Sequence, residues 1–166
     1  MIILIFIATF FFMEFVAWFT HKFIMHGLLW KLHADQHVPS HQSFFEKNDY
    51  FFLVFATPGI AFIVLGSFLE ISQFSAIGFG ITAYGMCYFL VHDIFIHQRF
   101  KWFRNSNNLY FRAIRRTHKV HHKKLGKHDG ECFGMLLVPL QYFRAEINSR
   151  AVGKQQRSQP NTKSKG

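Results

Sequence analysis

Residues 74–97, FSAIGFGITAYGMCYFLVHDIFIH, are the most informative part of the sequence, because an uncharged apolar run passes directly into a pair of histidines. A helix needs about 20 residues at roughly 1.5 Å each to cross the hydrocarbon core of a bilayer. Phe74–Val91 comes close to that length, and Tyr50–Leu69 reaches it without a charge. Met1–Phe19 is apolar apart from one threonine and one glutamate. The sequence therefore predicts three membrane-spanning helices.

The basic residues lie outside these three runs. The chain has a formal net charge of +10 although 50% of its residues are hydrophobic, and its 19 Lys and Arg fall in the blocks 22–47, 99–127 and 144–165. The positive-inside rule places these blocks and the C-terminus in the cytoplasm, with the Glu70–Gln73 connection on the opposite side. A soluble protein with a buried helical hairpin is the alternative, but 166 residues leave little to cover three such helices. The expected fold class is an all-α integral membrane helical bundle.

The C-terminal part of the chain changes character twice. Phe133–Phe143 is apolar, but 11 residues that include Pro139 are too few to cross a membrane alone. We predict a re-entrant or interfacial segment there. A four-span arrangement would require this segment to form part of the fourth span. Residues 150–166 carry almost no apolar side chains, which is typical of disorder. We therefore expect one membrane-embedded domain, residues 1–149, and a disordered basic tail, residues 150–166.

Histidine is the most informative residue type. Nine of the 11 histidines form four clusters, each beside the cytoplasmic end of a predicted span or in the adjoining basic segment. Nine imidazoles exceed what one ion can use, and neutral imidazole is a common ligand of iron and zinc, so two metal ions are expected. Iron is preferred by chemistry and analogy, because oxygenase sites keep open positions and structural zinc sites are closed. The predicted ligands are His21, His26, His33, His37, His92, His97, His118, His121 and His122.

The spacing within the clusters sets their geometry. Residues three and four apart share a helix face, so His118, His121 and His122 can point together, as can His33 and His37. The other pairs are five apart and diverge by about 140° on a regular helix. Either those helices contain π-helical distortions, which are frequent at functional sites, or the two imidazoles of a pair serve different metals.

Two acidic residues lie close to the histidines. Glu14 precedes His21 by two helical turns on the same face, so it could accept a proton from a ligand imidazole through an intervening group. Alternatively, it faces another helix or the interface. Asp93 follows His92 directly and is a candidate acceptor for a ligand imidazole, with simple solvent exposure as the alternative.

Five motifs together resemble the bacterial β-carotene hydroxylases, a branch of the fatty-acid hydroxylase and sterol desaturase superfamily. The resemblance covers roughly residues 14–140. It implies a membrane-embedded enzyme with two irons and O2 that adds a hydroxyl at C3 of each β-ionone ring, which converts β-carotene to β-cryptoxanthin and then zeaxanthin. The motifs are HKFIMHG (21–27), HADQH (33–37), FFEKND (44–49), YFLVHDIFIHQR (88–99) and HKVHHKKLGK (118–127).

One position departs from the family pattern. The family's second motif is similar to H-x-x-H-H, but Gln36 stands where its first paired histidine would be. The resemblance implies that nine of ten ligand positions are retained. The Gln36 carbonyl oxygen could ligate weakly or hold a metal-bound water, but it lacks the basicity of imidazole. We therefore expect metal affinity or activity below that of a chain with ten histidines.

These observations favour an O2-dependent di-iron monooxygenase. The sequence has no flavin or nucleotide motif, so the electrons must come from an external donor. The basic block 99–127 could bind an acidic ferredoxin, or more simply anionic lipid headgroups. A hydroxylase or desaturase of acyl chains or sterols is one alternative, and a non-enzymatic membrane metal binder is another. A nucleic-acid partner is not expected, because the basic block adjoins membrane spans.

Overall fold

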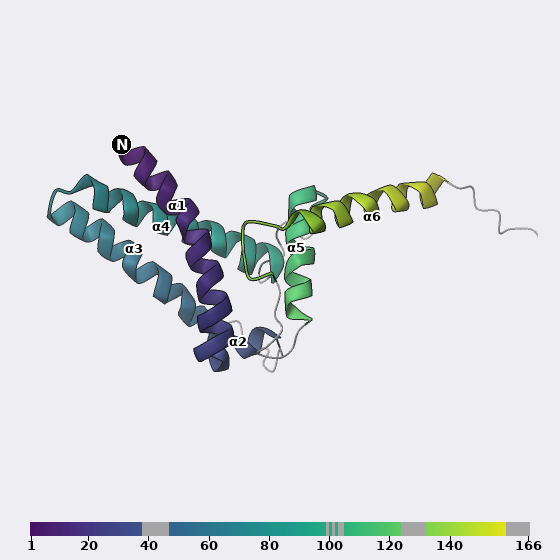
Figure 1. The fold of residues 1–166 in the computed structure, drawn as a ribbon, viewed down its shortest axis with the longest axis horizontal. Helices are drawn as coiled ribbons and strands as arrows, with labels where there is room; N and C mark the ends of the chain where they lie inside the picture. The colour runs from purple at the N-terminus through teal and green to yellow at the C-terminus, as the bar shows by residue number, and fades with distance from the viewer. Residues whose placement is uncertain (38–46, 99, 101, 103–104, 124–131, 159–166) are drawn as a thin grey trace, which may run out of the picture.

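The computed structural model describes residues 1–37, 47–98, 100, 102, 105–123 and 132–158, of which residues 35–37, 48 and 153–158 are described by their backbone alone. All regular structure in these ranges is helical (Figure 1). The elements in chain order are α1 (Ile2–Phe19), π-helical η1 (Thr20–Leu28), α2 (Trp30–His37), the 3-10 turn η2 (Lys47–Asp49), α3 (Tyr50–Phe68), α4 (Ser72–Phe89), π-helical η3 (Leu90–Ile96), α5 (Leu109–His122) and α6 (Leu140–Ser158).

Three helical units are long and apolar enough to cross a membrane. They are Ile2–Leu28, Tyr50–Phe68 and Ser72–Ile96, which confirms the three expected spans and the all-α class. The first and third units run past the ends expected from hydropathy, because α1 continues into η1 and α4 continues into η3 without a break. Many large apolar side chains on these units face outward, as in a helix surrounded by lipid.

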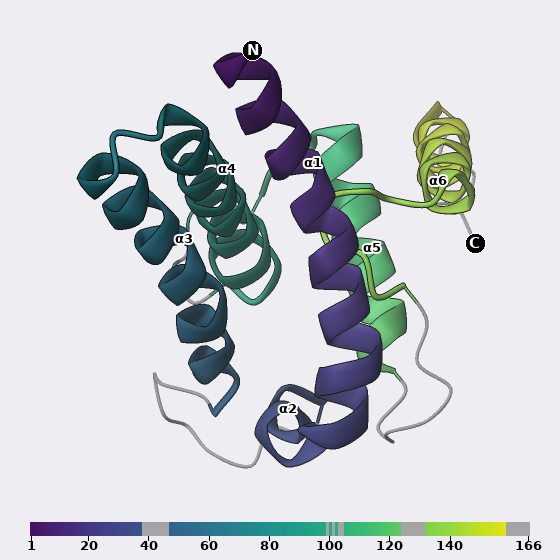
Figure 2. The same cartoon turned by 60° about the vertical axis from the view of Figure 1, so that its left-hand side comes forward.

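Small residues set the packing of the spans. In Figure 2, α4 lies between α3 and α1, and it packs against both. A Cβ atom at Gly78 would lie 2.7 Å from the carbonyl oxygen of Gly59 on α3. A Cβ at Gly80 would lie 2.8 Å from Cβ of Thr9 on α1. Glycine at these positions therefore permits close approach of the helix backbones, as is common within membranes.

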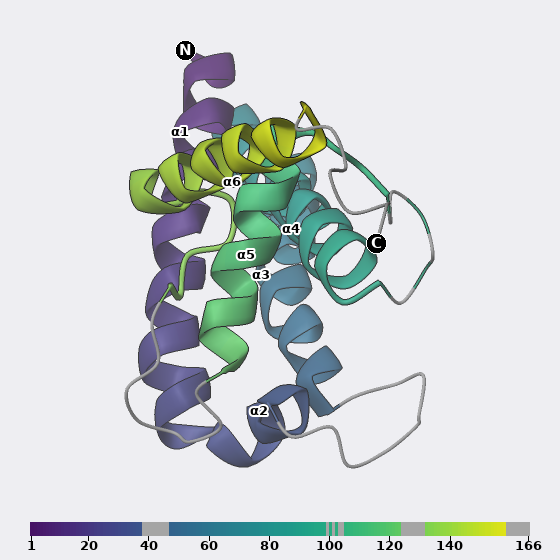
Figure 3. The same cartoon turned by 90° about the vertical axis from the view of Figure 1, so that its right-hand side faces the viewer.

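The two C-terminal helices lie outside this three-helix layer. α5 begins at an Asn108 cap whose side-chain oxygen accepts hydrogen bonds from the Tyr110 and Phe111 amides, at 2.9 and 3.4 Å. α6 is tied to α5 by Glu146, which forms ion pairs with Arg112 and, at 3.6 Å, with Arg116. Figure 3 shows α6 crossing one end of α5, and in Figure 1 it projects away from the rest of the protein.

The segment between α5 and α6 differs from a simple interfacial helix. Residues 132–139 have irregular backbone, and α6 starts only at Leu140, inside the segment expected to be re-entrant or interfacial. The irregular part packs back against α1 through Glu14, as described below. α6 also runs across the expected boundary at residue 149 and is helical through Ser158, whereas residues 159–166 lie outside the described part of the chain.

Candidate metal centre

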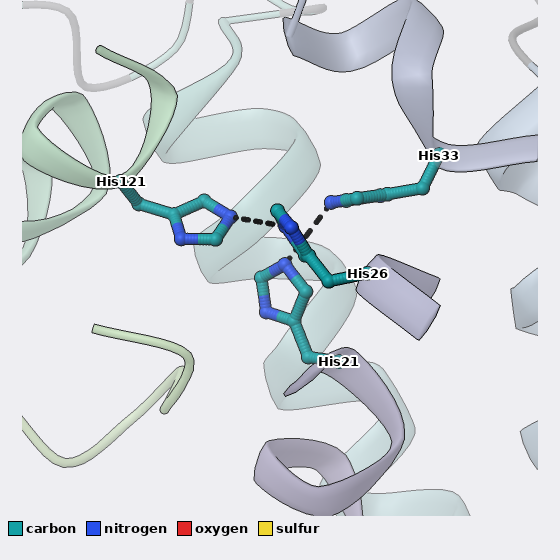
Figure 4. A group of neighbouring side chains, drawn as sticks. All are labelled: His21, His26, His33 and His121. Atoms are coloured by element: carbon teal, nitrogen blue, oxygen red, sulfur yellow. Dashed lines mark hydrogen bonds between the residues drawn. The ribbon is translucent and has the colours of Figure 1, made fainter. Parts of the chain in front are cut away.

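Four imidazoles from three elements form the first histidine group. Figure 4 shows their rings converging from η1, α2 and α5. The Nε2 atoms of His21 and His33 lie 3.1 Å apart, and those of His26 and His121 lie 3.2 Å apart. All four side chains are buried, and one nitrogen from each lies within 4.8 Å of the others.

A second histidine group lies between η3 and α5. One nitrogen from each of His92, His97 and His118 lies within 4.8 Å of the others. The Nε2 atoms of His97 and His118 are 3.1 Å apart. His122 adjoins this group, because its Nε2 atom is 2.6 Å from that of His118 and its ring centroid is 5.2 Å from that of His97.

The π-helical turns explain how histidines five residues apart reach one group. In a π-helix the backbone bonds join residues five apart, so these residues share a face. Bonds of this kind run from the Leu29 amide to the Ile24 carbonyl, at 2.7 Å, and from His97 to His92, at 2.9 Å. His21 and His26 therefore lie in the first group together, and His92 and His97 in the second. Of the two expected alternatives, the structure has the helical distortion.

The histidines of α5 do not all point together, which differs from the expectation. His121 contributes to the first group, and His118 to the second with His122 beside it. On an α-helix, positions three and four after His118 lie to opposite sides of it, about 100° from each other. α5 consequently lies between the two groups, and the ring centroids of His121 and His122 are 5.4 Å apart.

The outer nitrogens of two histidines have defined acceptors. His21 Nδ1 lies 3.1 Å from the carbonyl oxygen of Phe133. A carbonyl oxygen can only accept, so Nδ1 carries the proton and the Nε2 lone pair faces the first group. His92 Nδ1 lies 3.2 Å from Asp93 Oδ2, which is the arrangement expected of Asp93 as an acceptor for a histidine.

Glu14 contacts no imidazole directly among its described hydrogen bonds. Its carboxylate accepts hydrogen bonds from the Tyr84 hydroxyl at 2.7 Å and from the Met135, Leu136 and Leu137 amides at 2.9 to 3.0 Å. The expected link to His21 thus passes through the 133–137 segment.

Phe133 is a site residue that the sequence did not reveal. Its ring centroid lies 5.1 to 5.4 Å from those of His21, His26 and His121. No periodicity or charge marks this residue, because it lies in irregular backbone far along the chain from the histidines that it covers.

Two expected ligands fall where only the backbone is described. Gln36 and His37 lie on α2, three and four residues after His33. Their side chains are outside the described part of the structure, so their assignment as ligands stays a prediction.

The buried His118 imidazole is held in the neutral form that binds metal. Burial, and then the neighbouring His92, His97, His122 and His121, hold the pKa of His118 well below its ordinary value of 6.5. This imidazole is therefore neutral at physiological pH, as a metal ligand must be.

The nitrogen separations fit a shared metal ion. Two imidazole nitrogens about 2.1 Å from one ion, at angles of about 90° to 110°, lie roughly 2.9 to 3.4 Å apart. The separations of 3.1 Å for His21–His33, 3.2 Å for His26–His121 and 3.1 Å for His97–His118 fall in that range, whereas the 2.6 Å between His118 and His122 falls below it. The residues present thus fit two adjoining metal ions, one in each group.

Three helices of membrane-spanning length and two adjoining groups of imidazoles define a class of helical membrane proteins with histidine groups that could each hold a metal ion. Comparison with known sequences gives the family within that class. Residues 6–143 match the fatty acid hydroxylase family, and the chain belongs to it.

Several relatives are similar over most of the chain. A β-carotene hydroxylase of Pseudescherichia vulneris is 35% identical over 89% of this chain and 80% of the relative. A β-carotene hydroxylase of Pantoea ananas is 38% identical over 83% of this chain and 78% of the relative. A chloroplastic β-carotene 3-hydroxylase of Gentiana lutea is 35% identical over 86% of this chain but 47% of its own length. No solved structure matches the chain.

Proposed function

We propose that this chain is a β-carotene 3-hydroxylase, an O2-dependent di-iron monooxygenase that converts β-carotene to β-cryptoxanthin and zeaxanthin. The observation that carries the proposal is the pair of adjoining histidine groups, whose nitrogen separations suit two metal ions. The substrate is supported by the relatives, several of which are β-carotene hydroxylases similar over most of the chain.

The cofactor would be two iron ions held by the two groups. His21, His26, His33 and His121 would hold one ion, and His92, His97 and His118, with His122 adjoining, the other. When bound, iron supplies the activation of O2 that inserts an oxygen atom into an unactivated C–H bond. Iron is favoured over zinc because the proposed reaction is a redox reaction and zinc has no redox chemistry.

The protein residues position the ligands and keep the centre dry. The Phe133 carbonyl orients His21, and Asp93 orients His92. The Phe133 ring covers three imidazoles of the first group, which excludes water from that side. By the positive-inside rule, the centre and the C-terminus lie on the cytoplasmic side of the membrane.

The electrons would come from an acidic, ferredoxin-type donor bound at a basic cleft. The cleft has a volume of about 510 Å³, and its lining includes Arg112, Arg115, Arg116 and Lys119 together with Glu146. The Arg115 guanidinium donates to the Phe95 carbonyl at 3.2 Å, and Phe95 lies on η3 between two histidines of the second group. Charge complementarity at this cleft would therefore bring a donor close to the centre.

Charge reversal in this cleft tests the donor site. Lys119→Glu should raise the KM for a reduced ferredoxin several-fold and leave turnover with a small chemical reductant unchanged. Lys123→Glu is the matched control, because Lys123 lies four residues after Lys119 at the C-terminal end of α5 but is not among the residues that line the cleft. Equal effects of both substitutions would instead indicate a diffuse attraction by the whole basic block and would argue against a donor site in the cleft.

Pigment analysis tests the function as a whole. The chain is expressed in bacteria that accumulate β-carotene, and the pigments are separated by chromatography. We expect β-cryptoxanthin and zeaxanthin, and their absence from cells that express His97→Ala. Unchanged pigments with altered acyl chains or sterols would favour the alternative substrates of the family. Unchanged pigments and lipids would favour a non-enzymatic metal binder.

A further inference from the structure

A buried carboxylate on the first span holds a segment from the other end of the chain. Glu14 lies on α1 with 8% of its surface exposed. Its oxygens accept four donors, the Tyr84 hydroxyl and three successive backbone amides, Met135, Leu136 and Leu137. Such a group is costly within a membrane protein unless it is paired or functional.

The amides that Glu14 binds belong to irregular backbone. Residues 132–139 lack helical hydrogen bonds, so their amides need other acceptors when they pack against a span. One carboxylate satisfies three of them. Gly134 lies against the carboxylate, because a Cβ atom at this position would be 3.3 Å from Glu14 Oε1.

The segment held in this way reaches the first histidine group. The Phe133 carbonyl accepts from His21 Nδ1 at 3.1 Å, and the Phe133 ring lies against three of the four imidazoles. The chain of contacts therefore runs from Glu14 to the Met135 amide, through the backbone of Gly134 to the Phe133 carbonyl, and on to His21. The second group has a different support, because Asp93 contacts His92.

We propose that Glu14 is a positioning residue for the first metal only, because it fixes the segment whose Phe133 carbonyl sets the tautomer and orientation of His21. The proposal rests on the proposed binuclear centre. It assigns the two metals separate supports, Glu14 with Phe133 for one and Asp93 for the other. Loss of Glu14 should therefore release one metal and leave its neighbour in place.

Metal content and release in full-length Glu14 variants test this proposal. Iron per chain is measured by mass spectrometry, and its removal by a chelator is followed in time. Wild type should hold two ions. Glu14→Leu should hold about one, or release one of two about 10- to 100-fold faster, because outer contacts of ligand histidines tune affinity by that factor. Glu14→Gln keeps a carbonyl acceptor for the amides and should restore most of the loss.

Two substitutions control for a general weakening of the fold. Met13→Leu changes the buried neighbour of Glu14, and Tyr84→Phe removes one donor but leaves the three amides bound. Both should keep two ions. If Glu14→Leu does not fold, Gly134→Ala is the second variant: its Cβ would lie 3.3 Å from Glu14 Oε1, which crowds the carboxylate without altering it and should speed release of one ion.

Several outcomes of these metal-release measurements would overturn the proposal. Unchanged release in both Glu14→Leu and Gly134→Ala would overturn it. Parallel loss of both ions, or an equal loss in Tyr84→Phe, would also overturn it, because either result indicates a general structural role. A wild-type protein with fewer than one ion per chain would overturn the metal centre itself, and this inference with it.

Discussion

The Nε2 atoms of His26 and His121 lie 3.2 Å apart, although 95 residues separate the two histidines in the sequence. His26 belongs to η1 at the end of the first span, and His121 belongs to α5 beyond the third span. A metal ion shared by this pair would cross-link the first span to α5. Metal binding and the stability of the whole helical assembly should therefore be coupled.

Removal of metal should lower thermal stability. An ion present at about 100 times its dissociation constant stabilises the folded state by about 2.7 kcal/mol, which chelation would remove. We expect the Tm of the detergent-solubilised protein to fall by several degrees in chelator. His26→Ala should lower Tm in the absence of chelator and show a smaller further decrease in its presence. An identical Tm for wild type with and without chelator would contradict the cross-link.

Replacement of Asp93 should weaken the second metal site. Asp93 Oδ2 lies 3.2 Å from His92 Nδ1, where it fixes the ring and raises the basicity of the ligand nitrogen. Asp93→Asn should reduce affinity for one of the two metals by about 10- to 100-fold. Competition with a chelator of known affinity measures the change. Equal weakening of both metals would argue against a local role for Asp93.

A side chain at Gly80 should separate α1 from α4. Its Cβ would lie 2.8 Å from Thr9 Cβ and 2.9 Å from the Phe6 carbonyl oxygen, so the helices must move apart. Gly80→Val should destabilise the fold by about 1 to 3 kcal/mol, the range of overpacked cores. Gly85→Val is the matched control, because a Cβ at Gly85 meets nothing within 4 Å. Unfolding in detergent compares the two variants, and equal stabilities would refute the close contact.

The metal-free protein should lose stability in mild acid. The pKa of His118 lies well below 6.5 in the folded state because the side chain is buried. Below about pH 6.5, His118 is protonated in the unfolded chain but stays neutral in the folded protein. The free energy of unfolding therefore decreases as the pH falls, until the pKa of folded His118 is reached. Tm measured between pH 7.5 and 5.5 should decrease, and less steeply in His118→Gln. The same slope in both proteins would exclude His118 as a contributor.

Much of the fold and site follows from local sequence patterns. The three spans follow from uncharged apolar runs, and the ends of Tyr50–Phe68 agree with the expected helix to within one residue. The gathering of histidines follows from their position beside one end of each span. The five-residue spacing of His21 and His26 narrowed the local geometry to two alternatives, because a regular helix would have turned the rings apart, and the structure shows that the helix is π-helical there.

The other features of the fold and site depend on long-range contacts, which no local sequence pattern indicates. The Phe133 carbonyl accepts a hydrogen bond from His21, which lies 112 residues earlier in the chain. The Leu137 amide donates to Glu14, which lies 123 residues earlier. Backbone atoms make these contacts, so residue type gives no signal for them. The division of the α5 histidines between two groups was missed for a related reason, since helical spacing alone cannot tell one shared face from two diverging ones.

Metal content of the purified protein tests the central proposal most directly. Iron per chain is measured by mass spectrometry for wild type, His26→Ala, His97→Ala and the double variant. We predict about two ions in wild type, about one in each single variant and none in the double variant, because the two histidines belong to different groups. Fewer than one ion per chain in wild type, or loss of both ions in either single variant, would contradict two adjoining metal sites.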